Sequence, residues 1–527
     1  MRSRVRPLAI AVLAALLSAL LAVNCTSWRR EKTSPRDVLT AQKRDQVRVT
    51  LVGGARLELR DPWIEGDSLL GYQGTVPTGG ERTRWPHRRS DAVAIPLESV
   101  LHVELPHLDA GKSIGLVLGI GVTIAVVAIL LDSGHESTPV TFGGGGGDEM
   151  MSCPLVWSWD GLAWKLDSGT YAGAIMPALA RTGVDELEHA RAEGGIVRLR
   201  LTGLSGETEH VDALSLLVVD HDPGVAAVPD GAGGLHSVGE SRAPTRARDF
   251  AGRDALPRVA KADGWCWESV PVDRDPAIES DLHDGLELDF ARPPGARNAA
   301  LVVDATNTPW AAHLMREVVA MHGSGTQAWY DAVGADSARA ARIRAVFARE
   351  AFLRVSIWCR DGWQPQGMIW ESGPEVLKQQ AVHLDLSGAE GDAVRVRLDS
   401  APNLWLVDRV AIDYTPEREL TAKEVRPGQA RDLAGRDIRR LLAAEDRVEY
   451  VMTPADTAEV TFQVPPIPAG QTRTYLARTT GWYRIRTPES GEPQTAITDR
   501  LETEPGAVAR FAVTRMNRAL ATMAAGR

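Results

Sequence analysis

Two histidines and a glutamate near the middle of the chain are residue types that bind zinc, but their spacing does not suit a metal site. His313 and Glu317 lie four residues apart and share one face of a predicted helix. His322 follows His313 by nine residues and therefore points about half a turn away from that face. Because zinc-binding helices place both histidines on one face, we predict a surface helix here and no metal site.

A stretch rich in carboxylates has the residue types that bind calcium. Its acidic members are Asp273, Asp275, Glu279, Asp281 and Asp284. Calcium takes about six to eight oxygen ligands, and an EF-hand loop also needs glycine at its sixth position. Ile278 stands at that position, so we predict a solvated acidic loop.

Nucleophilic catalysis has no convincing residue set in this sequence. Asp220, His221 and Asp222 could orient a catalytic histidine, but no nucleophile is identifiable beside them, and we predict a turn at a strand end. The segment from Gly203 to Gly206 lacks the spacing of a nucleophile elbow, and neither a Walker A loop nor a dinucleotide fingerprint is present. We therefore assign no catalytic, cofactor-binding or metal-binding residue, and no cofactor.

Tryptophan is unusually common, with 15 residues against 7 Phe and 7 Tyr. Six of them could offer flat faces to sugars, namely Trp157, Trp159, Trp164, Trp358, Trp363 and Trp405. Alternation within a strand would place Trp157 and Trp159 on the same face. Because the large indole ring packs well in β cores, we predict core packing for this group rather than sugar stacking.

Composition and charge bound the class of protein. The chain of 527 residues is long enough for about three or four domains, and its hydrophobic content of 44% predicts packed cores. A net charge of −10 excludes a general nucleic-acid binder, which needs a basic face. The four cysteines form no C-x-x-C pair, which argues against a zinc ribbon. A Cys266–Cys359 disulfide and buried unpaired thiols both remain open.

Residues 1–25 have the pattern of an export signal. Arginines at positions 2, 4 and 6 precede an apolar run from Leu8 to Leu21, which only Ser18 interrupts. The run is shorter than the span of about 20 residues that a membrane needs. The chain then reaches Cys25 in a sequence that resembles a lipobox, apart from Asn24. We predict lipid attachment at Cys25, with an uncleaved anchor as the alternative.

The next stretch predicts a linker over residues 26–44 and a small β-barrel over residues 45–106. Val47, Val49 and Leu51 alternate with polar residues, as in a half-buried strand. Short strands separated by close turns are typical of SH3-like or Sm-like barrels. Such barrels bind many kinds of ligand, so the fold alone implies no function.

Residues 113–131 form a second apolar segment. From Ile114 to Leu131 the sequence carries no charge, and a helix of that length is about 27 Å long, just enough to cross a membrane. Gly115 and Gly119 have the G-x-x-x-G spacing that lets helices approach closely in lipid. We predict a transmembrane helix, with a glycine-rich apolar helix as the alternative. Residues 132–149, which are rich in glycine, predict a flexible linker.

The region from about 150 to 490 contains one ordered set of motifs twice. The clearest motif, Ala247–Asp254, recurs as Ala430–Asp437 with seven of eight positions identical. Four further landmarks keep the same order: Trp159–Trp164 with Arg360–Trp363, Val197–Leu201 with Val394–Leu398, Val211–Leu216 with Val407–Ile412, and Glu287–Phe290 before Trp310 with Glu459–Phe462 before Trp482. Several matches in one order indicate an internal duplication.

Both copies predict β structure. In Val197–Leu201 the aliphatic residues point to one face and the arginines to the other. A strand with one apolar face belongs to an antiparallel sheet packed on a second layer. We predict a mainly β fold with two duplicated β-sandwich modules, 150–312 and 351–490. A helical insert, 313–350, separates the modules, and a tail, 491–527, ends in a helix.

Two resemblances rest on these motifs. Ser152–Gly161, Ala247–Asp254 and Asn307–Trp310 resemble a family of uncharacterised bacterial envelope (lipo)proteins, and this resemblance implies a location but no activity. Trp405–Asp413 resembles the closing strands of galactose-binding-like jelly rolls, which implies a sandwich fold.

These observations favour a membrane-anchored cell-envelope protein that binds a protein or glycan partner without catalysis. Its predicted contact with the membrane is through the lipid anchor, the helix 114–131, or both. The two location signals conflict, because the arginine-rich segment before that helix favours the inside. We give weight to the export signal and predict that the bulk faces the periplasm or the outer surface. A secreted hydrolase or transferase with a site between the β modules is the first alternative, and a purely structural lipoprotein is the second.

Overall fold

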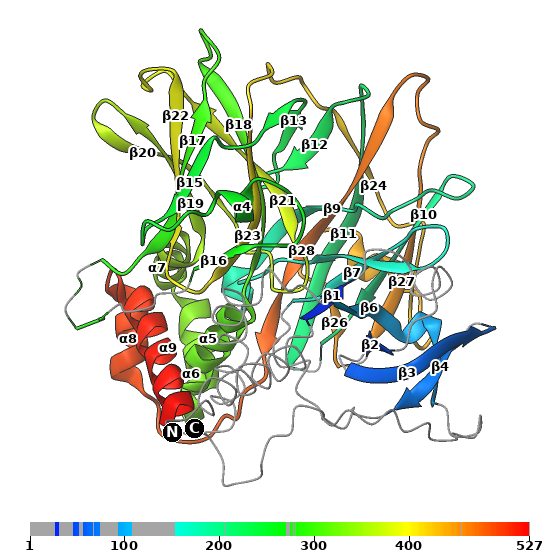
Figure 1. Cartoon of the computed structure of the whole chain (residues 1–527). Helices are drawn as coiled ribbons and strands as arrows, with labels where there is room; N and C mark the ends of the chain where they lie inside the picture. Colours follow the sequence, from blue (N-terminus) through cyan, green and yellow to red (C-terminus); the bar gives the residue numbers. More distant parts are fainter. Residues whose placement is uncertain are drawn as a thin grey trace, which may run out of the picture. The chain divides into compact units, whose positions relative to one another are not determined.

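The computed structural model of the chain is mainly β, with several antiparallel sheets and fewer helices (Figure 1). It describes residues 27–30, 46–51, 56–66, 68–73, 93–107, 153–204, 206–269, 275–277, 279, 281–454 and 456–525. These residues belong to two compact units, one before and one after the segment 108–152.

Three predicted segments lie outside the described residues. They are the export signal 1–25 with Cys25, the apolar helix 113–131 and the linker 132–149. Within the described part of the chain, no helix combines the length and the apolar character that a membrane span requires. Lipid attachment and membrane insertion therefore stay predictions.

The first unit is a six-stranded antiparallel sheet in the order β1-β6-β2-β3-β4-β5. Its strands are β1 (Ser27–Arg30), β2 (Gln46–Leu51), β3 (Arg56–Glu65), β4 (Ser68–Gln73), β5 (Val93–Pro96) and β6 (Val100–His107). A short 3₁₀ helix, Leu97–Ser99, joins β5 to β6. Alternate residues of the strands, among them Val47, Val49 and Val103, share one buried core, as their spacing predicts.

Strand β1 corrects the linker predicted for residues 26–44. Ser27–Arg30 pair with Glu104–His107 and extend the sheet beyond β6. The sequence gives little sign of this strand because its four residues, SWRR, show no alternation. Without β1, strand β6 would be the edge of the sheet and would have unpaired backbone groups, and β1 pairs with these groups.

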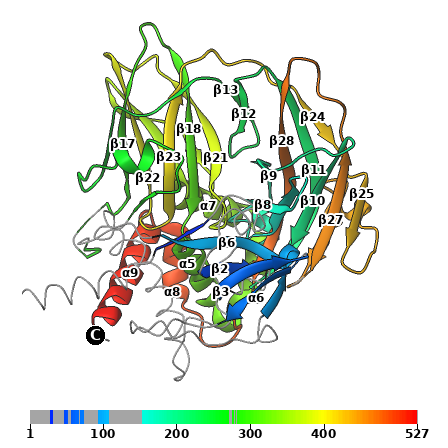
Figure 2. The ribbon, with the colours of Figure 1, turned by 45° about the vertical axis from the view of Figure 1, so that its right-hand side comes forward.

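The second unit contains four large antiparallel sheets, which face each other in two pairs (Figure 2). In sheet pair I, one sheet has the order β25-β27-β10-β7-β8 and the other has the order β24-β11-β28-β9, with β26 added to β11. Its strands are β7 (Leu155–Trp159), β8 (Trp164–Gly169), β9 (Arg181–Glu186), β10 (Ile196–Thr202), β11 (Glu207–His221), β24 (Ala422–Val425), β25 (Gln429–Asp432), β26 (Tyr450–Met452), β27 (Thr457–Gln463) and β28 (Thr472–Ile485). Leu199 and Phe462 of one sheet share a core with Leu216 and Tyr475 of the other.

Sheet pair II repeats this arrangement strand for strand. One sheet has the order β15-β17-β22-β19-β20 and the other has the order β14-β23-β18-β21, with β16 added to β23. Its strands are β14 (Ser241–Arg242), β15 (Arg246–Asp249), β16 (Trp267–Glu268), β17 (Asp284–Ala291), β18 (Asn298–Asn307), β19 (Leu353–Cys359), β20 (Gly362–Ile369), β21 (Lys378–Asp385), β22 (Ala393–Ser400) and β23 (Trp405–Asp413). A separate hairpin of β12 (Ala226–Pro229) and β13 (Leu235–Val238) precedes it in the chain.

The two sheet pairs are interleaved in sequence, which corrects the predicted module boundaries. Strand β10 pairs with β27, and β17 pairs with β22, so each sheet combines strands from the ranges 150–312 and 351–490. Neither range forms a closed body of its own. Because the two copies have similar strands, a strand of one copy can pair with a strand of the other copy in place of the equivalent strand of its own copy.

The repeated A-R-D motif forms the same turn in both copies. The Arg253 amide donates to the Asp249 carboxylate at 2.9 Å, and the Arg436 amide donates to Asp432 at 2.8 Å. Gly252 and Gly435 have φ of 81° and 78°, a conformation that favours glycine. Short helical turns, Leu256–Val259 (α4) and Arg439–Leu442, follow.

Helices from the insert and the tail lie together in one region of the second unit, as Figure 1 shows. They are α5 (Pro309–Ala320), α6 (Thr326–Ala335), α7 (Ser337–Val346), α8 (Thr495–Thr503) and α9 (Ala507–Ala525). Glu502 of α8 accepts hydrogen bonds from Trp329 at 2.7 Å and from Arg339 at 2.8 Å. The insert and the tail are therefore one helical layer.

This layer corrects the surface helix predicted around His313. His313 and His322 are only 8% and 6% exposed, and His322 stacks on Trp329 with ring centroids 4.1 Å apart. Glu317 pairs with Arg515 of α9 at 2.6 Å. Helix α9 of the tail, about 200 residues further along the chain, packs on this helix, and the local sequence pattern does not predict that contact.

We expect acid to weaken the helical layer through its buried histidines. Burial lowers the pKa of both His313 and His322 to about 4, whereas an unfolded histidine titrates near 6.5. The unfolded chain therefore binds these protons more readily as pH falls from about 6.5 to 4, and stability drops. His322→Phe, which keeps an aromatic ring against Trp329, should lose about 2 kcal/mol less unfolding free energy than the wild type between pH 6.5 and 4.5.

Urea denaturation at several pH values measures this difference. His383→Phe, at an exposed position of β21, serves as the matched control and should keep the wild-type pH dependence. An equal loss of stability in His322→Phe and wild type would contradict the burial argument.

We also expect residues 150–312 alone not to fold as a sandwich. In that fragment β10 lacks β27 and β17 lacks β22, so central backbone groups of both sheets have no partner. Circular dichroism during thermal unfolding should show no cooperative transition. Co-expression with residues 313–527 should restore one, and a sharp transition in the fragment alone would show that the pairing across copies is dispensable.

Candidate functional site

A cavity of the second unit lies where sheet pair I meets the helical layer. We call it the Trp482 pocket; its volume is about 350 Å³ and its lining residues are Pro177, Gln327, Tyr330, Asp331, Gly334, Trp482 and Arg484. Strand β28 contributes Trp482 and Arg484, and α6 contributes most of the rest. Ligand pockets of small molecules begin at about this volume.

A hydrogen-bonded stack fixes the Trp482 ring. Trp482 lies opposite His210 of β11, and the two rings are parallel within 11°, with centroids 3.7 Å apart. Glu449 accepts from Trp482 Nε1 at 2.7 Å and contacts His210 Nδ1 at 2.8 Å. One carboxylate thus holds both rings, and the indole cannot rotate without breaking a hydrogen bond.

His210 is neutral in this stack near pH 7. Burial lowers its pKa, although the neighbouring Glu449 carboxylate opposes that effect. A neutral imidazole with its proton on Nδ1 donates to Glu449 and leaves the ring face against the indole. The stack is therefore a neutral aromatic support rather than a charged one.

A chain of hydrogen-bonded polar groups lines the same pocket. Arg484 donates to Gln327 at 2.8 Å and to Glu489 at 2.6 Å, and Gln327 donates to Asp331 at 2.8 Å. The Arg484 guanidinium also lies over the Tyr330 ring, 4.9 Å from its centroid. These contacts orient an amide, a carboxylate and a guanidinium at one opening.

Tyr330 adds an unused hydrogen-bonding group. Its side chain is only 9% exposed, and its hydroxyl has no hydrogen-bond partner among the described residues. Burial raises the pKa of Tyr330 to about 12, so the hydroxyl keeps its proton at neutral pH. A buried hydroxyl without a partner is costly, and a ligand in the pocket would satisfy it.

The pocket suits binding better than catalysis. Among its described lining residues, Asp331 is the only carboxylate, and none is a serine, cysteine or histidine. Hydrolysis by acid and base needs two groups with different protonation states at one place. An aromatic wall beside polar groups instead matches a ligand with one apolar and one hydroxylated face.

The residues considered for chemistry in the sequence do not converge. Asp220 pairs with Arg473 at 2.6 Å and Asp222 with Arg418 at 2.6 Å, while β11 ends at His221, which confirms the predicted strand-end turn. In the acidic stretch, Asp273 lies outside the described residues. Of the residues that are described, no group of three or more His, Cys, Asp or Glu side chains could hold a metal ion.

The tryptophan prediction is confirmed for two residues and wrong for four. Trp157 and Trp405 are buried at 3% and 0% exposure. Trp159 with Trp164, and Trp358 with Trp363, form edge-on pairs 5.5 Å and 5.3 Å apart on outer sheet faces. Arginines of β10 and β22 lie over all four rings, so these faces are already covered. The covering cations fill the places that sugars would take.

The sequence did not predict Trp482 as a site residue, because Trp482 stood out there only as the counterpart of Trp310 in the duplicated motifs. The match does not hold in space, since Trp310 is fully buried in α5. The place in β18 that corresponds to Trp482 is Thr306, which lies opposite Leu406. A tryptophan beside alternating arginines late in β28 is the only local signal that could have pointed to the pocket.

The cysteine alternatives are also settled for two residues. Cys266 and Cys359 are free thiols, not a disulfide. Burial raises the pKa of Cys266 to about 12, which keeps the thiol protonated and unreactive. Neither residue belongs to the Trp482 pocket.

We expect Glu449→Gln to loosen the aromatic stack. A glutamine side chain is neutral, so it loses the charge-assisted hydrogen bonds that the carboxylate makes with the two part-buried rings, at a cost of about 1–3 kcal/mol. Urea denaturation followed by tryptophan fluorescence measures the loss. Glu489→Gln removes only the exposed partner of Arg484 and should cost less than about 1 kcal/mol. Equal effects of the two changes would argue that Glu449 does not hold the stack.

Comparison with known proteins assigns the chain to no family. No protein-family model matches the chain, and no curated protein is significantly similar to it. The resemblance to envelope proteins therefore stays a prediction from motifs. What the chain does has to be argued from the geometry of its own residues.

Proposed function

We propose that the chain is a non-enzymatic cell-envelope protein that binds a glycan in the Trp482 pocket. The observation that carries the proposal is that one pocket is lined by a rigidly held indole and by a tyrosine whose buried hydroxyl has no partner among the described residues. Saccharides have an apolar C–H face that packs on aromatic rings and hydroxyls that need donors and acceptors. The Trp482 pocket has both an aromatic ring for the C–H face and polar groups for the hydroxyls.

The rim groups fit the hydroxyls of a sugar ring. Asp331 accepts from hydroxyls, Arg484 donates to ring and hydroxyl oxygens, and Tyr330 can do either. Glu489 balances the charge of Arg484, so a neutral sugar is favoured over a highly charged one. Side chains already linked by hydrogen bonds lose little freedom when a ligand arrives.

The finer fold proposal is that gene duplication produced two sister β-sandwiches and that the first unit is an SH3-like or Sm-like barrel. Equal strand orders in sheet pairs I and II support the first part. Six short antiparallel strands around one apolar core, with a 3₁₀ turn before the last strand, support the second. Anchorage through Cys25 or residues 114–131, with the bulk in the periplasm or at the outer surface, rests on sequence patterns alone.

The position of the pocket favours this proposal over the alternatives. A hydrolase or transferase with its site between the β modules would need paired carboxylates or a nucleophile there. The Trp482 pocket instead lies between sheet pair I and α6, with one carboxylate at its edge. A purely structural lipoprotein would have no use for a pocket with a fixed aromatic wall.

A glycan array probed with the full chain tests the proposal. Trp482→Ala should abolish binding to the best glycan, because it removes the stacking wall, and Tyr330→Phe should weaken binding about tenfold by removing one hydrogen bond. Trp358→Ala, at a tryptophan that is 42% exposed elsewhere, serves as the control and should bind normally. Absence of any glycan binding, or equal binding by Trp482→Ala, would refute the proposal.

A further inference from the structure

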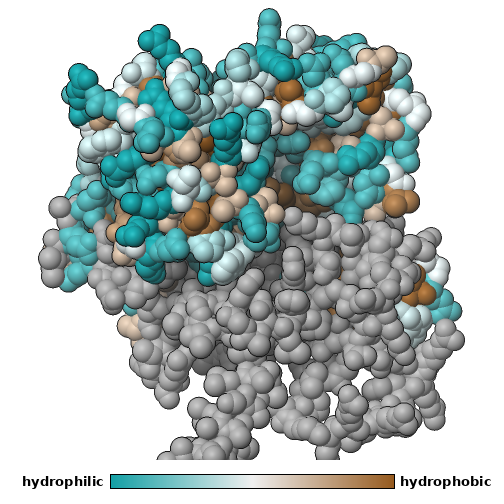
Figure 3. Space-filling view, turned by 45° about the horizontal axis from the view of Figure 1, so that its top comes forward, coloured by the Kyte–Doolittle hydropathy of each residue, from teal (hydrophilic) through white to brown (hydrophobic). Residues whose placement is uncertain are grey.

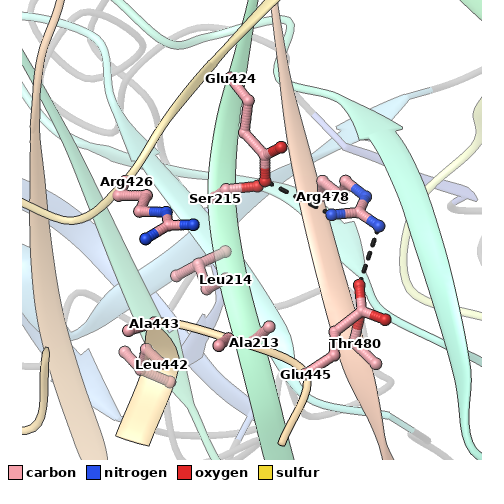
Figure 4. A pocket seen from close by; sticks show the side chains of 11 residues that line it. Ala213, Leu214, Ser215, Glu424, Arg426, Leu442, Ala443, Glu445, Arg478 and Thr480 are labelled. Atoms are coloured by element: carbon pink, nitrogen blue, oxygen red, sulfur yellow. Dashed lines mark hydrogen bonds and ion pairs between the residues drawn. The ribbon is translucent and has the colours of Figure 1, made fainter. Parts of the chain in front are cut away.

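A second cavity lies on the outer face of the β11–β28 sheet, and it has a different character. We call it the Arg426 pocket; its volume is about 230 Å³ (Figure 4). Its lining includes Ala213, Ser215, Glu424, Arg426, Glu445 and Arg478. Strands β11, β24 and β28 and the segment after the 3₁₀ turn Arg439–Leu442 thus surround it.

The two arginines of this pocket, Arg478 and Arg426, differ in their ion pairs. Arg478 contacts Glu424 at 3.4 Å and Glu445 at 2.8 Å, so both carboxylates are engaged by one guanidinium. Arg426 makes no hydrogen bond or ion pair with any described residue. Figure 4 shows Arg426 and Arg478 flanking Leu214 and Ser215. Arg426 is exposed to solvent, so its guanidinium is accessible and has no ion-pair partner among the described residues.

Sheet pair II shows what occupies the same place in the other copy. Ala213 lies opposite Thr480 in sheet pair I, and Arg409 lies opposite Asp304 in sheet pair II. Isolated bridges confirm the correspondence, since Ala213 meets Ala443 and Arg409 meets Ala260.

In sheet pair II, this position is filled by an ion pair. Arg409 Nε lies 2.7 Å from Asp304 Oδ2. The smaller Ala213 and Thr480 leave the matching space in sheet pair I open. The Arg426 pocket is therefore a specific difference between two otherwise equivalent scaffolds, not a general feature of the fold.

We propose that the Arg426 pocket binds a small monocarboxylate with a compact apolar body. A guanidinium without a partner binds a carboxylate through two parallel hydrogen bonds. The hydroxyl of Ser215 offers a further hydrogen bond, and Leu442 with its neighbouring alanines supplies apolar contact. This site is independent of the glycan proposal, because no residue lines both pockets.

Charge and size narrow the ligand class. Glu424 and Glu445 would repel a dianion such as phosphate more strongly than a monoanion. A water molecule takes about 30 Å³ of liquid, so the cavity holds on the order of eight groups of that size. Benzoate, with one carboxylate and one flat apolar ring, is of suitable size and serves as the probe.

Saturation-transfer NMR and calorimetry on the full chain test the site with three probes. Benzoate should bind saturably, while benzyl alcohol, its neutral counterpart, and inorganic phosphate should each bind at least tenfold more weakly. Arg426→Gln should weaken benzoate binding at least tenfold. Arg246→Gln, at an exposed arginine of β15, is the matched control and should bind like wild type.

A second variant separates loss of the site from loss of the fold. The double change Ala213→Arg with Thr480→Asp rebuilds the ion pair of sheet pair II and fills the cavity. It should abolish benzoate binding and leave the cooperative thermal transition in place, since the sister sheets carry this pair. Equal benzoate binding by this variant or by Arg426→Gln would overturn the proposal. So would the absence of saturable benzoate binding, or phosphate binding as tight as benzoate binding.

Discussion

Pairing of strands across the two copies is the constraint on which the rest of the second unit depends. The pairs β10–β27 and β17–β22 stand at the centres of their sheets, and each joins residues about 100 to 260 positions apart. Neither sheet pair can form until both copies have been made and their chains have crossed. Contacts between residues this distant close late in folding, because long loops must be ordered first. We therefore expect the second unit to fold as one cooperative body, not as two independent modules.

A duplicated scaffold also explains where the candidate sites lie. Backbone pairing and the A-R-D turns are kept in both copies, since they hold the sheets together. Side chains that do not serve this purpose differ between copies. Trp482 against His210 corresponds to Thr306 against Leu406, and Ala213 corresponds to Arg409. Both pockets arise at such differences, so the scaffold is shared while the chemistry belongs to sheet pair I.

The sequence predicts what is local and misses what depends on distant partners. Alternation in Val197–Leu201 and the repeated A-R-D turn predict strands and turns, because neighbouring residues decide them. The choice between β17 and β27 as the partner of β10 cannot be predicted this way, since both have the same apolar face. Burial of His313 depends on α9, and the Trp482 pocket depends on α6, so neither appears in local pattern.

Where the two sheet pairs meet, polar contacts accompany apolar packing of the β12–β13 hairpin, whose Ala227 packs on sheet pair I and whose Val228 packs on sheet pair II. Lys378 of β21 pairs with Asp185 of β9 at 2.6 Å, and Arg181 donates to the Glu371 backbone carbonyl at 3.1 Å. Burial raises the pKa of Glu371 to about 7, against the opposing effect of Arg181. Described residues on the face in Figure 3 are also mostly hydrophilic, with hydrophobic ones scattered. Because strands exchanged between the copies also hold the two sheet pairs together, buried charges such as those of Lys378 and Asp185 can lie between them.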